Sequence, residues 1–250
     1  RKIPIFSEKP LCKDYEEAKK LYEISKKNNT LLYTGYMYYF FETFNFVYNL
    51  IKDNILGEIY FSHGQMYVSQ ILKKQKRSTW RFNKKQSGGG VLITQSSHLI
   101  YLILLFFGDY EKCYGQIKSL YSENNEDYSA IIITSKSNVI NTINTSWSVD
   151  NYRTPYISIK IEGENGNILV TDDKVELFLK KDIKKYKRGN NIFYRTDLFK
   201  PTMFNIAGGH YNEQTEYFFN KLNKNETAED NLFFSMQTQK IISDIYKINE

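Results

Sequence analysis

Cysteine and proline are scarce in this chain, which has 2 cysteines and 4 prolines among its 250 residues. Cys12 and Cys113 stand in no metal-ligand spacing and cannot form a disulfide framework, so we expect no metal site and a reducing, cytoplasmic environment. Long apolar runs are lacking too, because the run from Leu99 to Phe107 is too short to span a bilayer. No signal peptide is visible. We therefore expect no association with a membrane.

Charge of one sign is not concentrated anywhere in the sequence. The formal net charge is +6, from 34 basic and 28 acidic residues, and the lysines are scattered among the acids. Nucleic-acid binding needs a clustered basic face with interleaved aromatic residues, so we expect a solvated surface and no nucleic-acid partner. The 41% hydrophobic content allows a substantial buried core, and the length fits one large domain or two small ones.

The first 37 residues have the pattern of a strand, a helix and a second strand. Residues 2–6 form an apolar run, and residues 30–36 are β-branched and aromatic. Between them, Asp14 is suited to cap a helix with an acidic first turn and a basic last turn. Such a unit is one parallel crossover. We therefore predict that residues 1–37 are the tail of a doubly wound, Rossmann-type sheet.

Residues 38–250 begin with alternating helix and strand patterns and then change to a meander. We predict helices at 44–54 and 91–107, a strand at 57–68, and a polar loop at 72–87. The helix at 91–107 is apolar on most sides, which indicates that it is buried. Short β-rich runs follow at 110–121, 128–135, 138–148, 155–162, 166–172 and 174–180.

The end of the chain contains an irregular segment and two amphipathic helices. We predict irregular structure at 182–203 and helices at 211–223 and 228–247. The whole pattern predicts an α/β fold, in which residues 38–250 form a second domain with a large, mostly antiparallel sheet. Helices should cover one face of this sheet and leave the other face open, with the strands between Tyr128 and Trp147 as candidates for that face.

One candidate for chemistry is Lys9, which follows the first strand and precedes Pro10. Pro10 stiffens the turn, so the lysine is held at the carboxyl edge of the sheet, where open α/β sheets bind ligands. A desolvated lysine there can donate to a substrate oxygen. An ordinary surface lysine in a loop is the alternative.

A second candidate is the helix that follows Gly88-Gly89-Gly90 and contains Thr94, Gln95 and His98. The glycines permit close backbone approach and unusual dihedral angles. Spacings of three and four residues place the polar side chains on one helix face. His98 can act as a general base near neutral pH. A core histidine with satisfied hydrogen bonds is the alternative.

These motifs occur together with others in a fixed order. The sequence contains Glu8-Lys9-Pro10, Gly35-Tyr36, Leu56-Gly57-Glu58-Ile59, Trp80-Arg81, Gly88-Gly89-Gly90 and Gln95-x-x-His98. With this combination the chain resembles the glucose–fructose oxidoreductase, inositol dehydrogenase and rhizopine catabolism (Gfo/Idh/MocA) family of NAD(P)-dependent oxidoreductases. The resemblance runs from the last third of the family's Rossmann domain to its C-terminus. The N-terminal Rossmann portion, with its Gly-x-Gly-x-x-Gly fingerprint, is lacking here.

The resemblance implies roles for individual residues. Lys9 would contact both the substrate and the nicotinamide, and His98 would take the proton of the substrate hydroxyl. The cofactor, NAD or NADP, would also lie against Glu8, Pro10, Trp80 and Arg81. The substrate would also lie against Thr94, Gln95 and His210.

The function implied by the resemblance is hydride transfer between NAD(P) and a secondary hydroxyl of a sugar, nucleotide sugar or cyclitol. Two other functions stay open, which are an NAD-dependent glycosidase that oxidises its substrate transiently and a non-catalytic nucleotide- or sugar-sensing regulator. The family also implies a homo-oligomer, a dimer or a tetramer, formed through the open face of the sheet. Thr94 and Tyr101 stand where relatives commonly have aspartate, and their effect on catalysis is open.

Overall fold

The chain begins with a small parallel unit. The computed structural model describes residues 3–73, 80, 83–123, 125–199 and 208–250. Strands β1 (Ile5–Ser7) and β2 (Leu32–Thr34) are parallel neighbours, joined by helix α1 (Tyr15–Asn28). Asp14 caps α1 by accepting a hydrogen bond from the Glu17 amide at 2.9 Å. The parallel crossover predicted for this region is therefore present.

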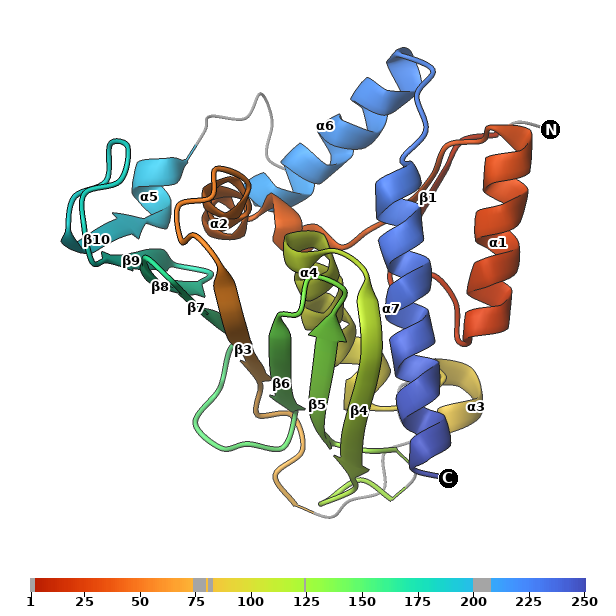
Figure 1. The fold of residues 1–250 in the computed structure, drawn as a ribbon. Helices are drawn as coiled ribbons and strands as arrows, with labels where there is room; N and C mark the ends of the chain where they lie inside the picture. Colours follow the sequence, from red (N-terminus) through yellow and green to blue (C-terminus); the bar gives the residue numbers. More distant parts are fainter. Residues whose placement is uncertain (1–2, 74–79, 81–82, 124, 200–207) are drawn as a thin grey trace.

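The largest element of the fold is an eight-stranded sheet with the strand order β10-β9-β8-β7-β3-β6-β5-β4 (Figure 1). Only the central neighbours β3 and β6 are parallel, and every other pair is antiparallel. The prediction of a large, mostly antiparallel sheet is confirmed. The strands are β3 (Ile59–Tyr67), β4 (Tyr110–Lys118), β5 (Tyr128–Ser135), β6 (Ile140–Ser146), β7 (Tyr156–Gly163), β8 (Gly166–Thr171), β9 (Lys174–Leu179) and β10 (Gly189–Tyr194).

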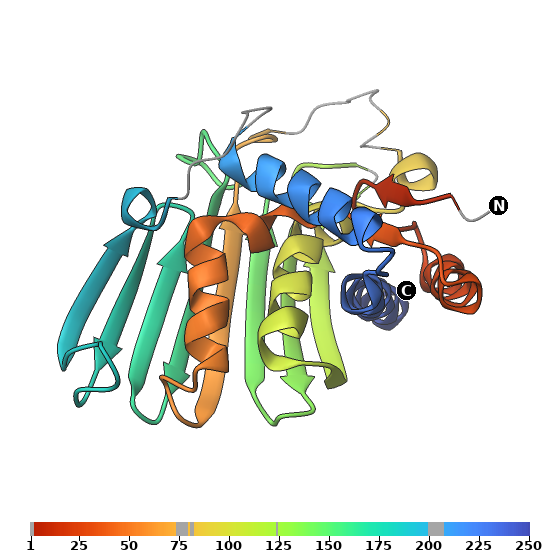
Figure 2. The same cartoon turned by 90° about the horizontal axis from the view of Figure 1, so that it is seen from above.

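Helices cover one face of this sheet. Helix α2 (Glu42–Lys52) packs on β8 and β9, and helix α4 (Ser97–Phe107) packs on β3 and β6. Figure 2 shows these two helices side by side over the strands. Two further helices, α6 (Gly209–Asn223) and α7 (Glu229–Ile248), tie the sheet to the small parallel unit, because α6 packs on the short helix η1 (Met37–Phe40) and α7 packs on α1 and α4.

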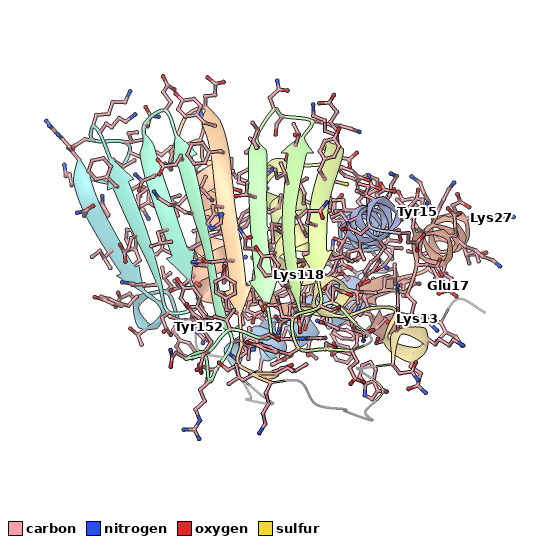
Figure 3. All side chains as sticks on the ribbon, turned by 90° about the horizontal axis from the view of Figure 1, so that it is seen from below. Lys13, Tyr15, Glu17, Lys27, Lys118 and Tyr152 are labelled. Carbon is pink, nitrogen blue, oxygen red and sulfur yellow. The ribbon has the colours of Figure 1, made fainter. Side chains whose placement is uncertain are left out.

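The other face of the sheet is open among the described residues. Figure 3 looks onto this side, where the strands lie in front of the helices. Along β5, Ile131 and Ile133 are buried under the helices, whereas Ile132 between them is 47% exposed. This alternation follows from the two-residue period of a strand. Trp147, which follows β6, does not belong to the open face, because it is buried against Val68, Ile71 and Val91.

Two predicted irregular segments contain regular structure. Residues 182–203 include β10 and the short helix α5 (Arg195–Leu198). The polar pair Asn190-Asn191 hides the strand pattern, and β10 forms because its backbone pairs with β9. The predicted loop at 72–87 ends in the short helix α3 (Lys84–Ser87), which Asn83 caps by accepting a hydrogen bond from the Lys85 amide.

The predicted helix at 91–107 is not α-helical throughout. Residues Leu92–Ser96 form a π-helical turn, η3, before α4 begins. With α3 the helical stretch Lys84–Phe107 has 24 residues and is long and apolar enough to cross a membrane, by length and composition alone. The apolar run Leu99–Phe107, which is too short to span a bilayer by itself, is only part of this longer stretch. The stretch Lys84–Phe107 is weak evidence for a membrane span, because 89% of its most apolar part is buried inside the protein.

Candidate functional site

Lys9 lies where the small parallel unit meets the helix that contains His98. It follows the end of β1, and its ammonium donates a hydrogen bond to the main-chain carbonyl of Thr94 at 2.5 Å. The two residues are 85 positions apart in the sequence. The Lys9–Pro10 peptide bond is cis. Lys9 is therefore not an ordinary surface lysine, because its ammonium is bonded to a distant segment of the chain.

The glycine motif is explained by close packing at the start of η3. A Cβ atom on Gly89 would collide with the Tyr246 hydroxyl, and one on Gly90 would collide with the main-chain carbonyl of Glu126. One carboxylate oxygen of buried Glu126 accepts hydrogen bonds from the Gly90 and Leu92 amides and from the Tyr246 hydroxyl, at 2.8, 3.0 and 2.8 Å. Glu126 thus fixes the start of this helical segment, and sequence reasoning missed it because it lies 36 residues from Gly90.

Thr94 and Gln95 lie on the π-helical turn. Residues 92–96 lack the α-helical spacing on which the predicted shared face of Thr94, Gln95 and His98 depends. The Thr94 hydroxyl donates to the Gly90 carbonyl at 2.7 Å, so this side chain bonds within its own segment. Gln95 is buried, and its Oε1 has no hydrogen-bond partner among the described residues. The predicted contacts of both side chains with a substrate stay predictions.

His98 is buried at the start of α4 and is only 6% exposed. The rings of Tyr36 and Tyr38 meet its ring edge-on, with centroids at 6.0 and 4.9 Å. Its Nδ1 atom is buried and has no hydrogen-bond partner in the described part of the chain. Burial, assisted by the charge of Lys9, holds the pKa of His98 well below its usual value of 6.5. The histidine is therefore neutral near pH 7 and is not a fully satisfied core residue.

A row of rings links His98 to the predicted residue His210. Tyr38 packs on Phe41 with ring centroids at 5.1 Å, and Phe41 stacks on His210 at 4.1 Å. We call His98, Tyr38, Phe41 and His210 the aromatic row. The two histidines, 112 positions apart in the sequence, stand at its opposite ends. Tyr38 and Phe41 are positioned by η1 and by the start of α2.

The His210 end of the aromatic row contains an ion pair. The Arg195 Nε donates to the Glu42 carboxylate at 2.8 Å, and the guanidinium lies 4.8 Å from the centre of the Phe41 ring. The Glu42 side chain is 4% exposed and that of Arg195 is 32% exposed. Burial and the nearby Arg195 charge lower the pKa of His210, so it is also neutral near pH 7.

Three further groups, Asp172, Tyr211 and Glu8, interact electrostatically with Tyr38 or with each other. Burial raises the pKa of Tyr38, and the charges of Asp172 and Tyr211 add to that effect. Burial also raises the pKa of Tyr211, with a smaller contribution from Glu8. Asp172 and Tyr211 were not predicted, since Asp172 looks like a turn residue and no motif marks Tyr211. Glu8 is exposed, and its predicted contact with a cofactor stays a prediction.

The structure says less about the other residues predicted to contact the cofactor, which are Pro10, Trp80 and Arg81. Trp80 is 57% exposed, and its carbonyl accepts a hydrogen bond from the Asn83 amide. Arg81 lies outside the described residues. Pro10 follows Lys9 in the same turn and is partly buried. The contacts of all three with a nucleotide stay predictions.

Tyr101 anchors the helix of His98 to the small parallel unit. Its ring stacks on Tyr36 at 4.2 Å, and its hydroxyl accepts a hydrogen bond from the Asn231 amide at 2.9 Å. The Asn231 side chain also bonds both the amide and the carbonyl of Thr34 at the end of β2. A tyrosine at position 101 therefore holds α4, α7 and β2 together.

A sequence profile of the GFO/IDH/MocA C-terminal domain matches residues 44–169, which is half of the chain. The chain belongs to the GFO/IDH/MocA family. Two curated proteins share an 85-residue segment with this family member. These are 2,7-anhydro-N-acetylneuraminate hydratase of Escherichia coli K12, at 31% identity, and an uncharacterized oxidoreductase of Streptococcus pneumoniae, at 24%. The segment covers 34% of the chain but only 22% and 23% of these relatives.

Solved structures match the GFO/IDH/MocA chain over nearly its whole length. Levoglucosan dehydrogenase in complex with NADH and levoglucosan has a TM-score of 0.85 at 18% identity. An oxidoreductase domain protein from Kribbella flavida has a TM-score of 0.86 at 14% identity. Each match covers 98% of this chain and 70% or 71% of the other. At such low identity the likeness establishes the fold alone, which is the α/β fold predicted from the sequence.

Proposed function

We propose that this family member transfers a hydride between NAD(P) and a secondary hydroxyl of a sugar, nucleotide sugar or cyclitol. The observation that carries the proposal is the meeting of Lys9 with the helix of His98. A cationic donor lies one helical turn from a neutral, buried histidine, as the Lys9 bond to Thr94 and the lowered pKa of His98 indicate. A donor and a base side by side are the groups that alcohol oxidation requires.

Each residue of the pair has a separate task in the proposal. His98, which is neutral near pH 7, accepts the proton that leaves the substrate hydroxyl. Lys9 donates to the oxygen of that hydroxyl and stabilises the negative charge that develops on it. The Thr94 carbonyl orients the ammonium toward this position. Thr94, Gln95 and His210 would then surround the rest of the substrate.

The residues present fit the nicotinamide end of a dinucleotide. Lys9 follows a parallel strand at the edge where open α/β folds bind nucleotides. The Gln95 Oε1 and the His98 Nδ1 are buried polar atoms without partners among the described residues, so they can accept a polar ligand. When bound, NAD(P) would supply the hydride acceptor or donor. In this proposal Glu8, Pro10, Trp80 and Arg81 lie on the cofactor side.

The proposal also assigns roles to the two parts of the chain. Residues 1–37 would complete a dinucleotide-binding domain, and residues 38–250 would bind the substrate and a second subunit. Exposed apolar side chains on the open sheet face support the second role, and they include Phe61, Ile132, Ile140 and Phe178. A dimer or tetramer formed through this face follows from the proposal.

A reaction without net redox change is the second candidate. The relative named as a hydratase supports it, because hydration leaves no reduced coenzyme behind. NAD-dependent glycosidase chemistry, in which a hydride is removed and then returned, has the same signature. In either case Lys9 and His98 would keep the tasks given above.

The test uses the protein as its complete gene encodes it, incubated with NAD or NADP and a panel of sugars and cyclitols. Formation of reduced coenzyme in equal amount to oxidised product is expected. Product that forms without reduced coenzyme would select the second candidate. Coenzyme binding without turnover of any substrate would favour a sensor, and failure to bind either coenzyme would overturn the proposal.

A further inference from the structure

Glu126 is a buried carboxylate that the proposed chemistry does not use. It lies just before β5 and is 6% exposed. Its main-chain carbonyl accepts a hydrogen bond from the Val91 amide at 2.9 Å, and its carboxylate binds the amides on either side, those of Gly90 and Leu92. The first amides of a helix have no partners within the helix, and here three consecutive ones bind the same distant residue.

A negative charge suits the place that Glu126 occupies. The amino end of a helix favours an anionic group, because the aligned peptide dipoles leave partial positive charge there. Burial raises the pKa of Glu126, and hydrogen bonds from the Tyr246 hydroxyl and from the two amides limit that rise. The Tyr246 hydroxyl keeps its proton, because burial and the charge of Glu126 hold its pKa well above its usual value. Glu126 therefore caps the helical segment from a distant part of the chain.

Three successive contacts lead from Glu126 to Lys9. The Gly90 amide donates to the Glu126 carboxylate at 2.8 Å. The Gly90 carbonyl then accepts hydrogen bonds from both the amide and the hydroxyl of Thr94, at 3.1 and 2.7 Å. The Thr94 carbonyl in turn accepts the hydrogen bond of the Lys9 ammonium at 2.5 Å. A displacement of the amides that Glu126 holds would thus reach the carbonyl that holds Lys9.

We propose that Glu126 is a positioning residue, which fixes the Thr94 carbonyl and thereby orients the Lys9 ammonium toward the substrate oxygen. The inference rests on the proposed function, since it concerns the hydrogen-bond donor of the same site. Reacting groups must be held closely, because a displacement of about 1 Å can lower a rate about a hundredfold. Removal of the Glu126 charge should therefore lower turnover through Lys9, beyond any loss of stability.

The experiment compares two adjacent buried carboxylates, Glu126 and Asp127, in the protein as its complete gene encodes it. Asp127 is the matched control, because its side chain also accepts hydrogen bonds from three main-chain amides, at 2.6, 2.7 and 2.9 Å, but these belong to residues 120–122. Glu126→Gln and Asp127→Asn each keep the shape of the side chain and remove its charge. Tyr246→Phe is a milder change, which removes one donor to Glu126. Denaturant titration gives the stability of each variant, so that only folded proteins are compared.

Turnover is measured with NAD or NADP and the panel of sugars and cyclitols described above. Glu126→Gln should lower kcat by about tenfold to a hundredfold and change KM by less than about threefold, since the displaced donor acts in the reaction step. Asp127→Asn should leave kcat within about twofold of the wild type, even where it lowers stability. Tyr246→Phe should lower kcat less than Glu126→Gln does. When Lys9→Met is already present, Glu126→Gln should have almost no further effect on kcat, because both changes act on the same donor.

A second measurement needs no substrate. Acetic anhydride acetylates accessible lysine amines, and mass spectrometry gives the rate of acetylation at each site. Glu126→Gln should loosen the Thr94 carbonyl and raise the acetylation rate of Lys9 by about fivefold, as the loss of one hydrogen bond predicts. Lys13, which also donates to a main-chain carbonyl, is the internal reference and should not change. Asp127→Asn should alter neither rate.

Equal effects of Glu126→Gln and Asp127→Asn on kcat and on Lys9 acetylation would overturn the inference, as would additive effects of Glu126→Gln and Lys9→Met on kcat. The proposed function fails separately. A rise in Lys9 acetylation that is specific to Glu126→Gln, without coenzyme reduction even by the wild type, would retain the positioning of Lys9 and reject the dehydrogenase. Coenzyme reduction that is indifferent to Glu126→Gln would retain the dehydrogenase and reject the positioning role.

Discussion

The two ends of the aromatic row are built from different interactions. At the His98 end every anchoring bond includes a main-chain group, because the Lys9 ammonium donates to the Thr94 carbonyl and the Gly90 and Leu92 amides donate to the Glu126 carboxylate. At the His210 end side chains hold one another, through the ion pair of Arg195 and Glu42. His98 is almost fully dehydrated, whereas Arg195 at the other end keeps contact with water.

This difference matches the two tasks of an enzyme site. Reacting groups need fixed positions and tuned pKa values, and main-chain anchors provide both with little freedom to shift. Groups that recognise a substrate need complementary charge and hydrogen-bonding capacity, which side chains provide. We therefore expect changes at the His98 end to lower kcat, and changes at the His210 end to alter binding or stability.

The largest effect is expected from His98→Ala. Removal of a general base lowers the rate by about a hundredfold to ten-thousandfold, so kcat should fall by that amount with the fold retained. His63→Ala is the matched control, because the His63 Nδ1 lies 2.8 Å from the Thr142 hydroxyl on the sheet, away from the site. Steady-state kinetics on both variants checks this. Similar kcat values for the two would remove His98 from the chemistry.

Lys9→Met should have the next largest effect. It removes the donor to the substrate oxygen and keeps much of the apolar stem, so kcat should fall by about a hundredfold or more. Lys13→Met is the control, because Lys13 also donates to a main-chain carbonyl, that of Lys85 at 3.4 Å. If Lys9→Met changed only KM, the lysine would contribute to substrate binding and not to the chemical step. The His98 end of the aromatic row would then not be distinguished by its effect on kcat.

Glu42→Gln should act on stability more than on chemistry. It leaves Arg195 without its partner and should lower the free energy of unfolding by about 2 kcal/mol, a reduced value because Arg195 is partly exposed. Glu176→Gln is the control, since its pair with Lys174 is exposed on both sides and should contribute nothing measurable. Denaturant titration checks both variants. A lower kcat with an unchanged free energy of unfolding would mean that Glu42 takes part in the reaction rather than in stabilising the fold.

The smallest effect is a pH dependence of stability. His98 has a lowered pKa in the folded protein, so below pH 6.5 the unfolded chain binds a proton that the folded protein does not. The stability associated with neutral His98 is complete above pH 6.5 and is lost as the pH falls further, by up to about 1.4 kcal/mol per pH unit. In denaturant titrations between about pH 5 and pH 7, the free energy of unfolding of His98→Gln should fall less steeply with decreasing pH than that of the wild type. Equal slopes would mean that His98 is not held neutral.

Much of the fold could be predicted from local patterns. The capped helix after Asp14 and the apolar helix containing Leu99 are correct, because capping and periodicity act within a few residues. The π-helical turn was not predicted. The segment in which it lies begins where the Gly90 and Leu92 amides donate hydrogen bonds to Glu126, which is distant in the sequence. Strand β10 was missed because its pairing with β9, rather than its own polar sequence, makes it a strand.

The candidate site divides in the same way. Lys9 and His98 stand in recognisable motifs, and the structure brings the lysine onto the segment that leads to the histidine. Arg195 and Tyr211 belong to no motif, and they come near Phe41 and Tyr38 only because α5 packs on α2 and α6 packs on η1.

The sequence by itself determined the α/β class, the family and the two residues on which the proposed chemistry depends, because these are encoded in short segments and their spacing. The tertiary structure alone decided which groups are buried without partners and which charges face each other. Burial and charge pairing arise between residues far apart in the chain, as with His98 against Lys9 and Arg195 against Glu42. They set the protonation state of His98 and the charge at the His210 end of the aromatic row.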